Sequence, residues 1–208
     1  FVKLANHYPL EVMIFNEIDK VVREQNTTED ELLVEVDENN REIGSIIKRE
    51  AHANPNKYHR AAWIFIFNTK GEVVLQQRGL NKTHNPGLWD MAGGHQIYGN
   101  TIEQTAHQEL MEEMGIEAEL KLKSIGLYKS EWQSEFHYLY WGNHDGPYKF
   151  DPNEVETVKT FDCQKLLDHE YDKDYPIMSH VYEQLEILRP EWEDLVKKAR
   201  QKKLLAGG

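Results

Sequence analysis

The chain has 208 residues, 39% of them hydrophobic and 11% aromatic, and a formal charge of −12 at pH 7. This composition excludes a disordered chain and is typical of one compact catalytic domain with additions. The acidic excess disfavours a nucleic-acid partner, because affinity for the phosphate backbone depends on Lys and Arg.

Two β-hairpins are predicted in the first part of the chain. Residues 32–36 and 43–47 are two short segments rich in apolar side chains, and a polar turn at 37–40 separates them. This pattern indicates an N-terminal hairpin. Residues 59–68 and 72–78 are rich in β-branched and aromatic side chains and are separated by a Thr-Lys-Gly turn, which indicates a central hairpin.

A loop and then a helix follow the central hairpin. Residues 79–89 contain Asn, Lys, Thr, His, Pro and Gly without a period, so we expect a loop over one end of the sheet. Asn100 with Glu103 is a capping-box arrangement, and apolar residues then recur until Gly115, so we expect a helix over 101–114 with Asn100 as its N-cap.

The remaining pattern predicts strands and then helices, and therefore a mixed α/β (α+β) fold. We expect an N-terminal extension at 1–31, a catalytic domain at 32–170 that includes the N-terminal hairpin, and a helical extension at 171–208 packed on that domain. The further strands are predicted at 119–129, 135–141 and 155–161, and the helices at 176–188 and 190–203.

Targeting and redox signals point to a cytoplasmic protein without a membrane partner. The first residues lack the basic segment and apolar core of a secretory signal, and no stretch approaches 18 apolar residues. The single cysteine, Cys163, excludes an intrachain disulfide and a multi-cysteine metal site, and we expect it to be a small core or helix-start residue.

Three glutamates on the predicted central helix are the principal candidates for chemistry. Glu109 lies three and four residues before Glu112 and Glu113, so the three carboxylates share one helix face. In isolation such a pattern is more often a solvated face. Here Gly93-Gly94 precedes the helix and would let the backbone approach a ligand closely. Oxygen ligands of this kind suit Mg²⁺ or Mn²⁺, which would in turn bind the phosphate oxygens of a small-molecule diphosphate substrate.

Residues 94–116, GHQIYGNTIEQTAHQELMEEMGI, resemble the signature of the Nudix family. Seven of its nine defined positions match, and the resemblance implies a mixed sheet sandwiched between helices, with Glu109, Glu112 and Glu113 as metal ligands. Two positions depart from it, because Asn100 replaces the family's first Glu and Gln108 replaces its Arg. We hypothesise that the two amides keep a neutral contact in place of the family's ion pair.

Residues 32–141 also resemble type I isopentenyl diphosphate isomerase, a relative with the Nudix fold. The resemblance implies that His52, His59, His95 and Glu135 form a second metal site for Zn²⁺ or Mn²⁺, with Gln133 at the position of another glutamate ligand. Gly93 stands where that isomerase has its catalytic cysteine. Without a thiol the isomerase lacks its acid, which disfavours isomerisation here.

Other candidate residues surround these two groups. Arg78 and Lys82 are predicted to contact substrate phosphates together with the Gly93-Gly94 backbone, whereas Trp89 is expected to pack in the core. Glu135 is a candidate catalytic carboxylate that would assist the attacking water, and Glu131 and Glu154 remain alternatives for an extra acidic ligand or base.

The sequence therefore favours a metal-dependent hydrolase that cleaves a diphosphate bond in a nucleoside diphosphate derivative or a similar small molecule. The alternatives are an enzyme like the isopentenyl diphosphate isomerases and a ligand-sensing domain without turnover. The N-terminal hairpin and C-terminal helices are candidate surfaces for a homodimer.

Overall fold

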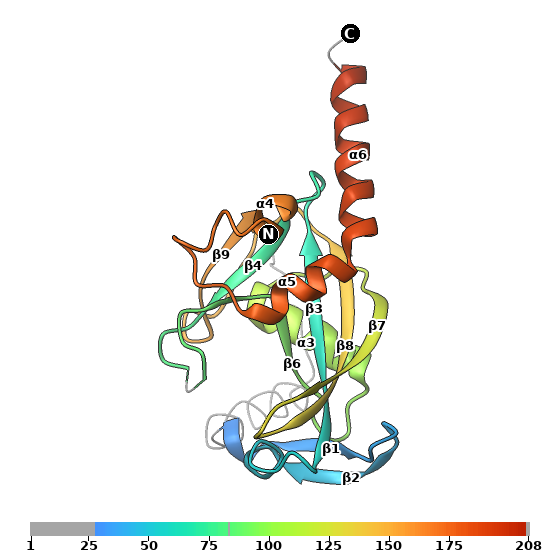
Figure 1. The fold of residues 1–208 in the computed structure, drawn as a ribbon, viewed down its shortest axis with the longest axis vertical. Helices are drawn as coiled ribbons and strands as arrows, with labels where there is room; N and C mark the ends of the chain where they lie inside the picture. The colour runs from blue at the N-terminus through green and yellow to red at the C-terminus, as the bar shows by residue number, and fades with distance from the viewer. Residues whose placement is uncertain (1–27, 83, 207–208) are drawn as a thin grey trace, which may run out of the picture.

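The fold is a mixed sheet with helices on both of its faces (Figure 1). The computed structural model describes residues 28–82 and 84–206. Most of the N-terminal extension expected at 1–31 lies outside these residues. The strands are β1 (Leu32–Val36), β2 (Glu42–Ile47), β3 (Tyr58–Phe67), β4 (Val73–Arg78), β5 (Trp89–Asp90), β6 (Ala92–His95), β7 (Lys121–Lys129), β8 (Ser134–Asn143) and β9 (Val155–Phe161). The helices are the 3₁₀ turn η1 (Thr28–Asp30), α2 (Lys48–Ala51), α3 (Ile102–Met114), α4 (Cys163–Leu167), α5 (Ser179–Ile187) and α6 (Arg189–Ala206).

Strand β3 is the centre of the sheet. It runs parallel to β8 along its whole length and antiparallel to β1, β4 and β6. Its pairing with β4 is limited to Ile66 with Val74 and Phe67 with Val73. Beyond those two pairs the central hairpin opens, β6 lies beside β3, and β5 and β9 lie beside β4. The two hairpins predicted from sequence are confirmed.

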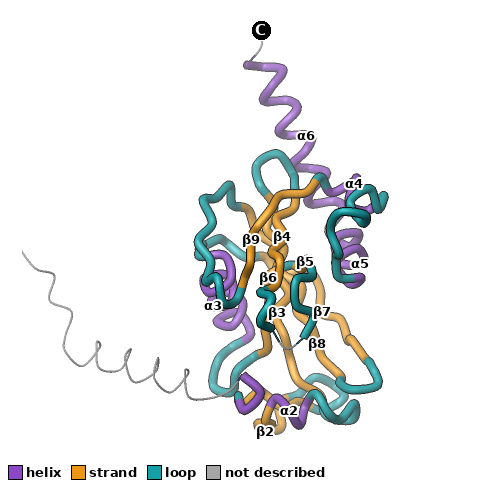
Figure 2. The backbone as a smooth tube through the Cα atoms, turned by 90° about the vertical axis from the view of Figure 1, so that its left-hand side faces the viewer, coloured by secondary structure: helices purple, strands orange, loops and turns teal. Residues whose placement is uncertain are grey.

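Both faces of β3 are covered, which explains why its sequence is apolar throughout rather than alternating. Ile64 and Ile66 pack with Leu110 of α3 on one face, whereas Phe65 and Phe67 pack with α5 on the other. Figure 2 shows α3 and α5 on opposite sides of the strands. The mixed fold sandwiched between helices, predicted from the family resemblance, is confirmed.

Helix α3 begins one residue later than predicted. Thr101, not Asn100, is the N-cap: its side chain accepts from the Gln104 N–H, and the Gln104 side chain accepts in return from the Thr101 N–H. The N-cap prediction was wrong because the sequence offers two overlapping capping boxes, one beginning at Asn100 and one at Thr101. The predicted end is confirmed, since Gly115 has φ 62° and closes the helix in the left-handed conformation.

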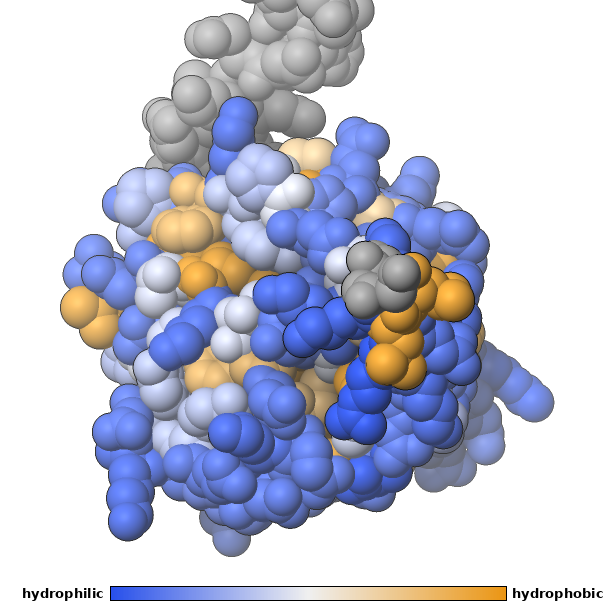
Figure 3. All heavy atoms as spheres, turned by 90° about the horizontal axis from the view of Figure 1, so that it is seen from above, coloured by the Kyte–Doolittle hydropathy of each residue, from blue (hydrophilic) through white to orange (hydrophobic). Residues whose placement is uncertain are grey.

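The C-terminal helices have different surroundings. Leu185 of α5 and Trp192 near the start of α6 are buried in the core, whereas the rest of α6 projects beyond the sheet (Figure 1). Leu204 and Leu205, near its end, are exposed, and the view in Figure 3 shows a largely hydrophilic face with smaller hydrophobic areas. Among residues 28–82 and 84–206, no helix is both long and apolar enough to cross a membrane.

Five short elements are absent from the sequence-based expectation, and two single-residue expectations are confirmed. The 3₁₀ turn η1, helices α2 and α4 and strands β5 and β6 have at most five residues each, too few to produce a period. Cys163 is buried as the first residue of α4, and Trp89 is buried in the core, as predicted.

Candidate active site

Three adjacent strands bring the histidines and Glu135 together. His59 on β3 pairs in register with Glu135 on β8, and Ala61 of β3 pairs with His95 of β6. His52 follows α2 at its C-cap. One ring nitrogen of each histidine lies within 4.8 Å of those of the other two, and Glu135 Oε2 lies 3.3 Å from His95 Nε2 and 3.5 Å from His59 Nε2.

Two residues of this histidine cluster, His59 and Glu135, carry buried polar atoms without hydrogen-bond partners. Both ring nitrogens of His59 and the Oε1 atom of Glu135 are buried without one. Buried polar groups are almost always satisfied, so orphaned atoms converging on one point fit a bound cation. Three imidazoles with one carboxylate form the donor set expected for Zn²⁺ or Mn²⁺.

Burial and the surrounding charges also favour the ligand forms of these groups. Burial lowers the pKa of His52 to about 3, and the neighbouring His95 and His59 act in the same direction. Burial likewise lowers the pKa of His95, although Glu135 opposes this effect. Burial raises the pKa of Glu135, but the nearby imidazoles of His59 and His95 outweigh it and leave that pKa well below its usual range. His52 and His95 are thus neutral and Glu135 is ionised near neutral pH, as metal binding requires of such groups.

Glu113 and Glu109 project from α3 toward the glycine pair of β6. Glu113 Oε2 accepts hydrogen bonds from the Gly93 N–H at 2.9 Å and from the Gln76 side chain at 2.6 Å. The carboxylate of Glu109 lies so close to Gly94 that any Cβ there would collide with it. Glycine at position 94 leaves the space that the Glu109 carboxylate occupies, and close approach of this backbone to a ligand stays a prediction.

These two carboxyl groups hold protons more tightly than ordinary glutamates. Burial raises the pKa of Glu113 to about 7 in spite of its two hydrogen bonds. Burial, with the neighbouring Glu113 and Glu112 carboxylates, raises the pKa of Glu109 well above its usual range. A divalent cation between such groups would relieve the repulsion, because opposite charge favours the ionised form.

Glu112 is placed differently from the other two glutamates. It is exposed, and its Oε1 atom accepts a hydrogen bond from the Gln108 side chain at 2.9 Å. The Gln108 side chain in turn accepts one from Asn100 at 3.3 Å. The two amides therefore form the neutral contact that we hypothesised, and that contact continues to Glu112.

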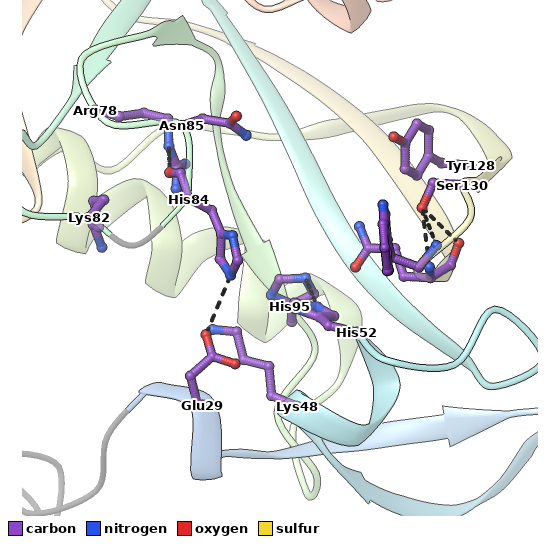
Figure 4. Close-up of a pocket in the computed structure, with 12 residues that line it drawn as sticks. Glu29, Lys48, His52, Arg78, Lys82, His84, Asn85, His95, Tyr128 and Ser130 are labelled. Carbon is purple, nitrogen blue, oxygen red and sulfur yellow. Dashed lines mark hydrogen bonds and ion pairs between the residues drawn. The ribbon is translucent and has the colours of Figure 1, made fainter.

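A cavity of about 670 Å³ opens above the histidine cluster (Figure 4). Its lining includes His52, His95 and the predicted phosphate contacts Arg78 and Lys82. Arg78 donates to the His84 carbonyl at 3.3 Å, and Lys82 forms an ion pair with Glu154. Glu154 thus has a structural partner beside the cavity.

Two further residues of the site were not singled out from sequence. Lys48 lines the cavity and forms an ion pair with Glu31 at 3.1 Å, and Gln76 orients Glu113. A strand-to-helix boundary and a buried strand position are ordinary places for Lys and Gln, so the sequence carries no signal for either. Glu131, an alternative acidic ligand in the sequence, is exposed on the hairpin between β7 and β8.

Relatives of known name are similar to this chain in sequence. The chain is 37% identical over 145 residues to an isopentenyl-diphosphate Delta-isomerase of Serratia proteamaculans, a match that covers 67% of this chain and 80% of the relative. It is 31% identical over 180 residues to the isomerase of Streptomyces avermitilis, covering 82% of this chain and 90% of that protein.

Solved structures share the fold. The DR0079 protein of Deinococcus radiodurans aligns with a TM-score of 0.63 at 19% identity, covering 75% of this chain and 98% of that protein. The NUDIX domain of Shewanella oneidensis NrtR, solved with ADP ribose, aligns with a TM-score of 0.53 at 17% identity, covering 64% of this chain and 88% of that one. The family model described as NUDIX domain matches residues 57–185. With that match over more than half of its length, the chain belongs to the Nudix family.

Proposed function

We propose that this protein is a divalent-metal-dependent hydrolase that cleaves a diphosphate bond in a small molecule. The observation that carries the proposal is the position of Glu109 and Glu113, two carboxylates of raised pKa that meet the Gly93-Gly94 backbone of β6, the strand whose His95 lines a cavity with cationic residues. The family membership supports an enzyme that acts on diphosphate compounds.

The residues divide into those that would hold metal and those that would bind substrate. Glu109 and Glu113, with Glu112 at the exposed side, would hold Mg²⁺ or Mn²⁺, and the histidine cluster with Glu135 would hold Zn²⁺ or Mn²⁺. A bound cation supplies charge neutralisation at the phosphates and polarises the phosphorus. Arg78, a permanent cation at the cavity wall, orients the phosphate oxygens by hydrogen bonds.

The chain's own groups also serve proton transfer. The Gly93 N–H and the Gln76 side chain fix the Glu113 carboxylate, so its orientation is set before substrate binds. Glu109 lies against Gly94, and a bound cation would lower its raised pKa, so its ionised carboxylate would then accept a proton from the attacking water. Glu135 remains the alternative base on the other side of β6.

Isomerisation is the second candidate because the relatives named above are isomerases and because the histidine cluster is intact. The environment of Gly93 counts against it. A Cβ added at Gly93 would collide with the carbonyl oxygen of Ala62 on the neighbouring strand. With β3 and β6 paired as they are, the site lacks the isomerase's cysteine and has no room for one.

The test is turnover of a panel of diphosphate compounds with Mg²⁺ and with Mn²⁺, measured as release of phosphate or nucleoside monophosphate. We expect Glu109→Gln and Glu113→Gln to reduce turnover by about 100-fold or more. Glu103→Gln, an exposed glutamate in the first turn of the same helix, is the matched control and should retain it.

Isopentenyl diphosphate in deuterated water separates the two candidates. Exchange of deuterium into its carbon skeleton without phosphate release would replace the hydrolase proposal with isomerisation. Absence of both reactions over the whole panel, with metal and nucleotide still bound, would favour the ligand-sensing alternative.

A further inference from the structure

The hairpin between β7 and β8 presents two aromatic side chains to the cavity. Trp132 is 68% exposed and Tyr128 is 41% exposed, and both line the cavity with Ser130 and Gln133. In Figure 4, Tyr128 and Ser130 lie on one side of the histidines, and Arg78, Lys82 and His84 lie on the other. The cavity therefore has a cationic wall, a metal-ligating floor and an aromatic wall.

The backbone of the turn that carries Trp132 is ordered by its own hydrogen bonds. The Ser130 hydroxyl accepts hydrogen bonds from the Trp132 N–H at 3.2 Å and the Gln133 N–H at 3.1 Å. The Ser130 N–H donates to the Gln133 carbonyl at 2.9 Å, and the Ser134 hydroxyl donates to the Pro55 carbonyl at 2.6 Å. A turn ordered before ligand binding loses little conformational entropy when it contacts a ligand.

An exposed indole on an ordered turn leaves a large apolar ring in contact with water. Large aromatic side chains mostly bury their rings, and those left open beside a cavity commonly mark a binding site. Trp132 is followed by Gln133, which also lines the cavity and carries an amide, whereas the Ser130 hydroxyl is already bonded within the turn. A flat π-face bordered by a hydrogen-bonding group matches a planar base and its sugar better than it matches a branched alkyl chain, which gains most from an enclosed apolar pocket.

We propose that Trp132 is the stacking platform for the base of a nucleoside diphosphate derivative, and that this contact selects nucleotides over alkyl diphosphates. The inference rests on the proposed function for one point, that the diphosphate lies between the metal-ligating residues and Arg78. The base then extends across the cavity to Trp132, and Gln133 lies within reach of its polar edge or of the sugar.

Binding of ADP and of isopentenyl diphosphate, each measured by calorimetry with Mg²⁺, tests the proposal without requiring turnover. For ADP we expect Trp132→Ala to raise the dissociation constant by about 10- to 100-fold, as loss of one base–aromatic stack does. Trp132→Phe keeps a π-face and should stay within about 3-fold of wild type. The affinity for isopentenyl diphosphate should change by less than about 2-fold in either variant, since it has no base to stack.

Leu122→Ala is the matched control, because Leu122 is an exposed apolar residue of β7 outside the cavity lining. It should leave both affinities unchanged. An equal loss of both ligands in Trp132→Ala, or no loss of ADP, would overturn the proposal. So would a wild-type protein that does not bind ADP, even if it hydrolyses another diphosphate. If ADP binds in a way that depends on Trp132 but no nucleotide is hydrolysed, the stacking role of Trp132 is supported and the proposed hydrolase activity is refuted.

Discussion

Replacing Glu113 by Gln will change how the stability of the metal-free protein depends on pH. Burial raises the pKa of Glu113 from 4.5 to about 7, so between these values the folded protein holds a proton that the unfolded chain has released. The folded state therefore binds more protons than the unfolded state, and the free energy of unfolding falls as pH rises. This contribution to stability is fully present below pH 4.5 and is lost as pH rises through 7.

The size of the effect follows from the two pKa values. The change from 4.5 to about 7 corresponds to about 3 kcal/mol, at 1.36 kcal/mol for each pH unit. Glutamine does not ionise, so the free energy of unfolding of the variant does not fall for this reason as pH rises. His52 and His95 act with the opposite sign, because their lowered pKa values make the protein more stable as pH rises toward 6.5. Their contribution is present in both proteins and cancels in the comparison.

Urea unfolding at several pH values from 5 to 8, with a chelator present, measures the difference. We expect the wild type to lose about 3 kcal/mol relative to Glu113→Gln across this range, and the exposed control Glu103→Gln to track the wild type. Addition of Mg²⁺ at 100 times its dissociation constant should then restore about 2.7 kcal/mol to the wild type and much less to the variant. A difference between wild type and Glu113→Gln that does not vary with pH would refute the reasoning.

Three further substitutions test other parts of the structure. Gly93→Ala should destabilise the protein by about 1–3 kcal/mol in urea unfolding, because its Cβ would collide with the Ala62 carbonyl; unchanged stability would reveal free space there. Asn100→Glu with Gln108→Arg should lose less turnover than either single substitution, since the pair is in contact, and additive losses would show that it acts independently. Leu185→Ala should cost about 2–5 kcal/mol of unfolding free energy, because its fully buried side chain joins α5 to the sheet; a cost below about 1 kcal/mol would contradict that packing.

Local patterns in the sequence predicted most elements because those elements are long enough to show a period. The central strand β3 is displaced by one residue at each end, helix α3 begins one residue late, and β9 has the predicted bounds. The two-residue strand β5 is held by pairing with β4 and by contact with the segment before α5, not by its own propensity. Tertiary partners of this kind leave no trace in a local window, so such elements emerge only in three dimensions.

In the candidate site, too, local sequence patterns predicted some features and others depended on tertiary contacts. Spacing along one helix placed Glu109, Glu112 and Glu113 on a shared face, but it did not predict that the first and third would point to Gly93-Gly94 while the second stayed exposed. The family resemblance grouped the histidines, whose sequence positions are far apart. Trp132 was not singled out, because an aromatic residue in a turn has no meaning until its cavity is known.

Strand β6 joins the two groups of candidate ligands, which lie on opposite faces of the sheet. Adjacent residues of a strand face opposite ways, so Gly94 leaves room for Glu109 on the α3 side while His95 joins the cluster with Glu135 on the other. The N–H of Gly93 fixes Glu113 in the same four-residue strand. A slip of β6 by one residue against β3 would turn a histidine toward Glu109 and remove it from the cluster, abolishing both groups together. The two small residues are therefore as necessary to the proposed chemistry as the charged ones.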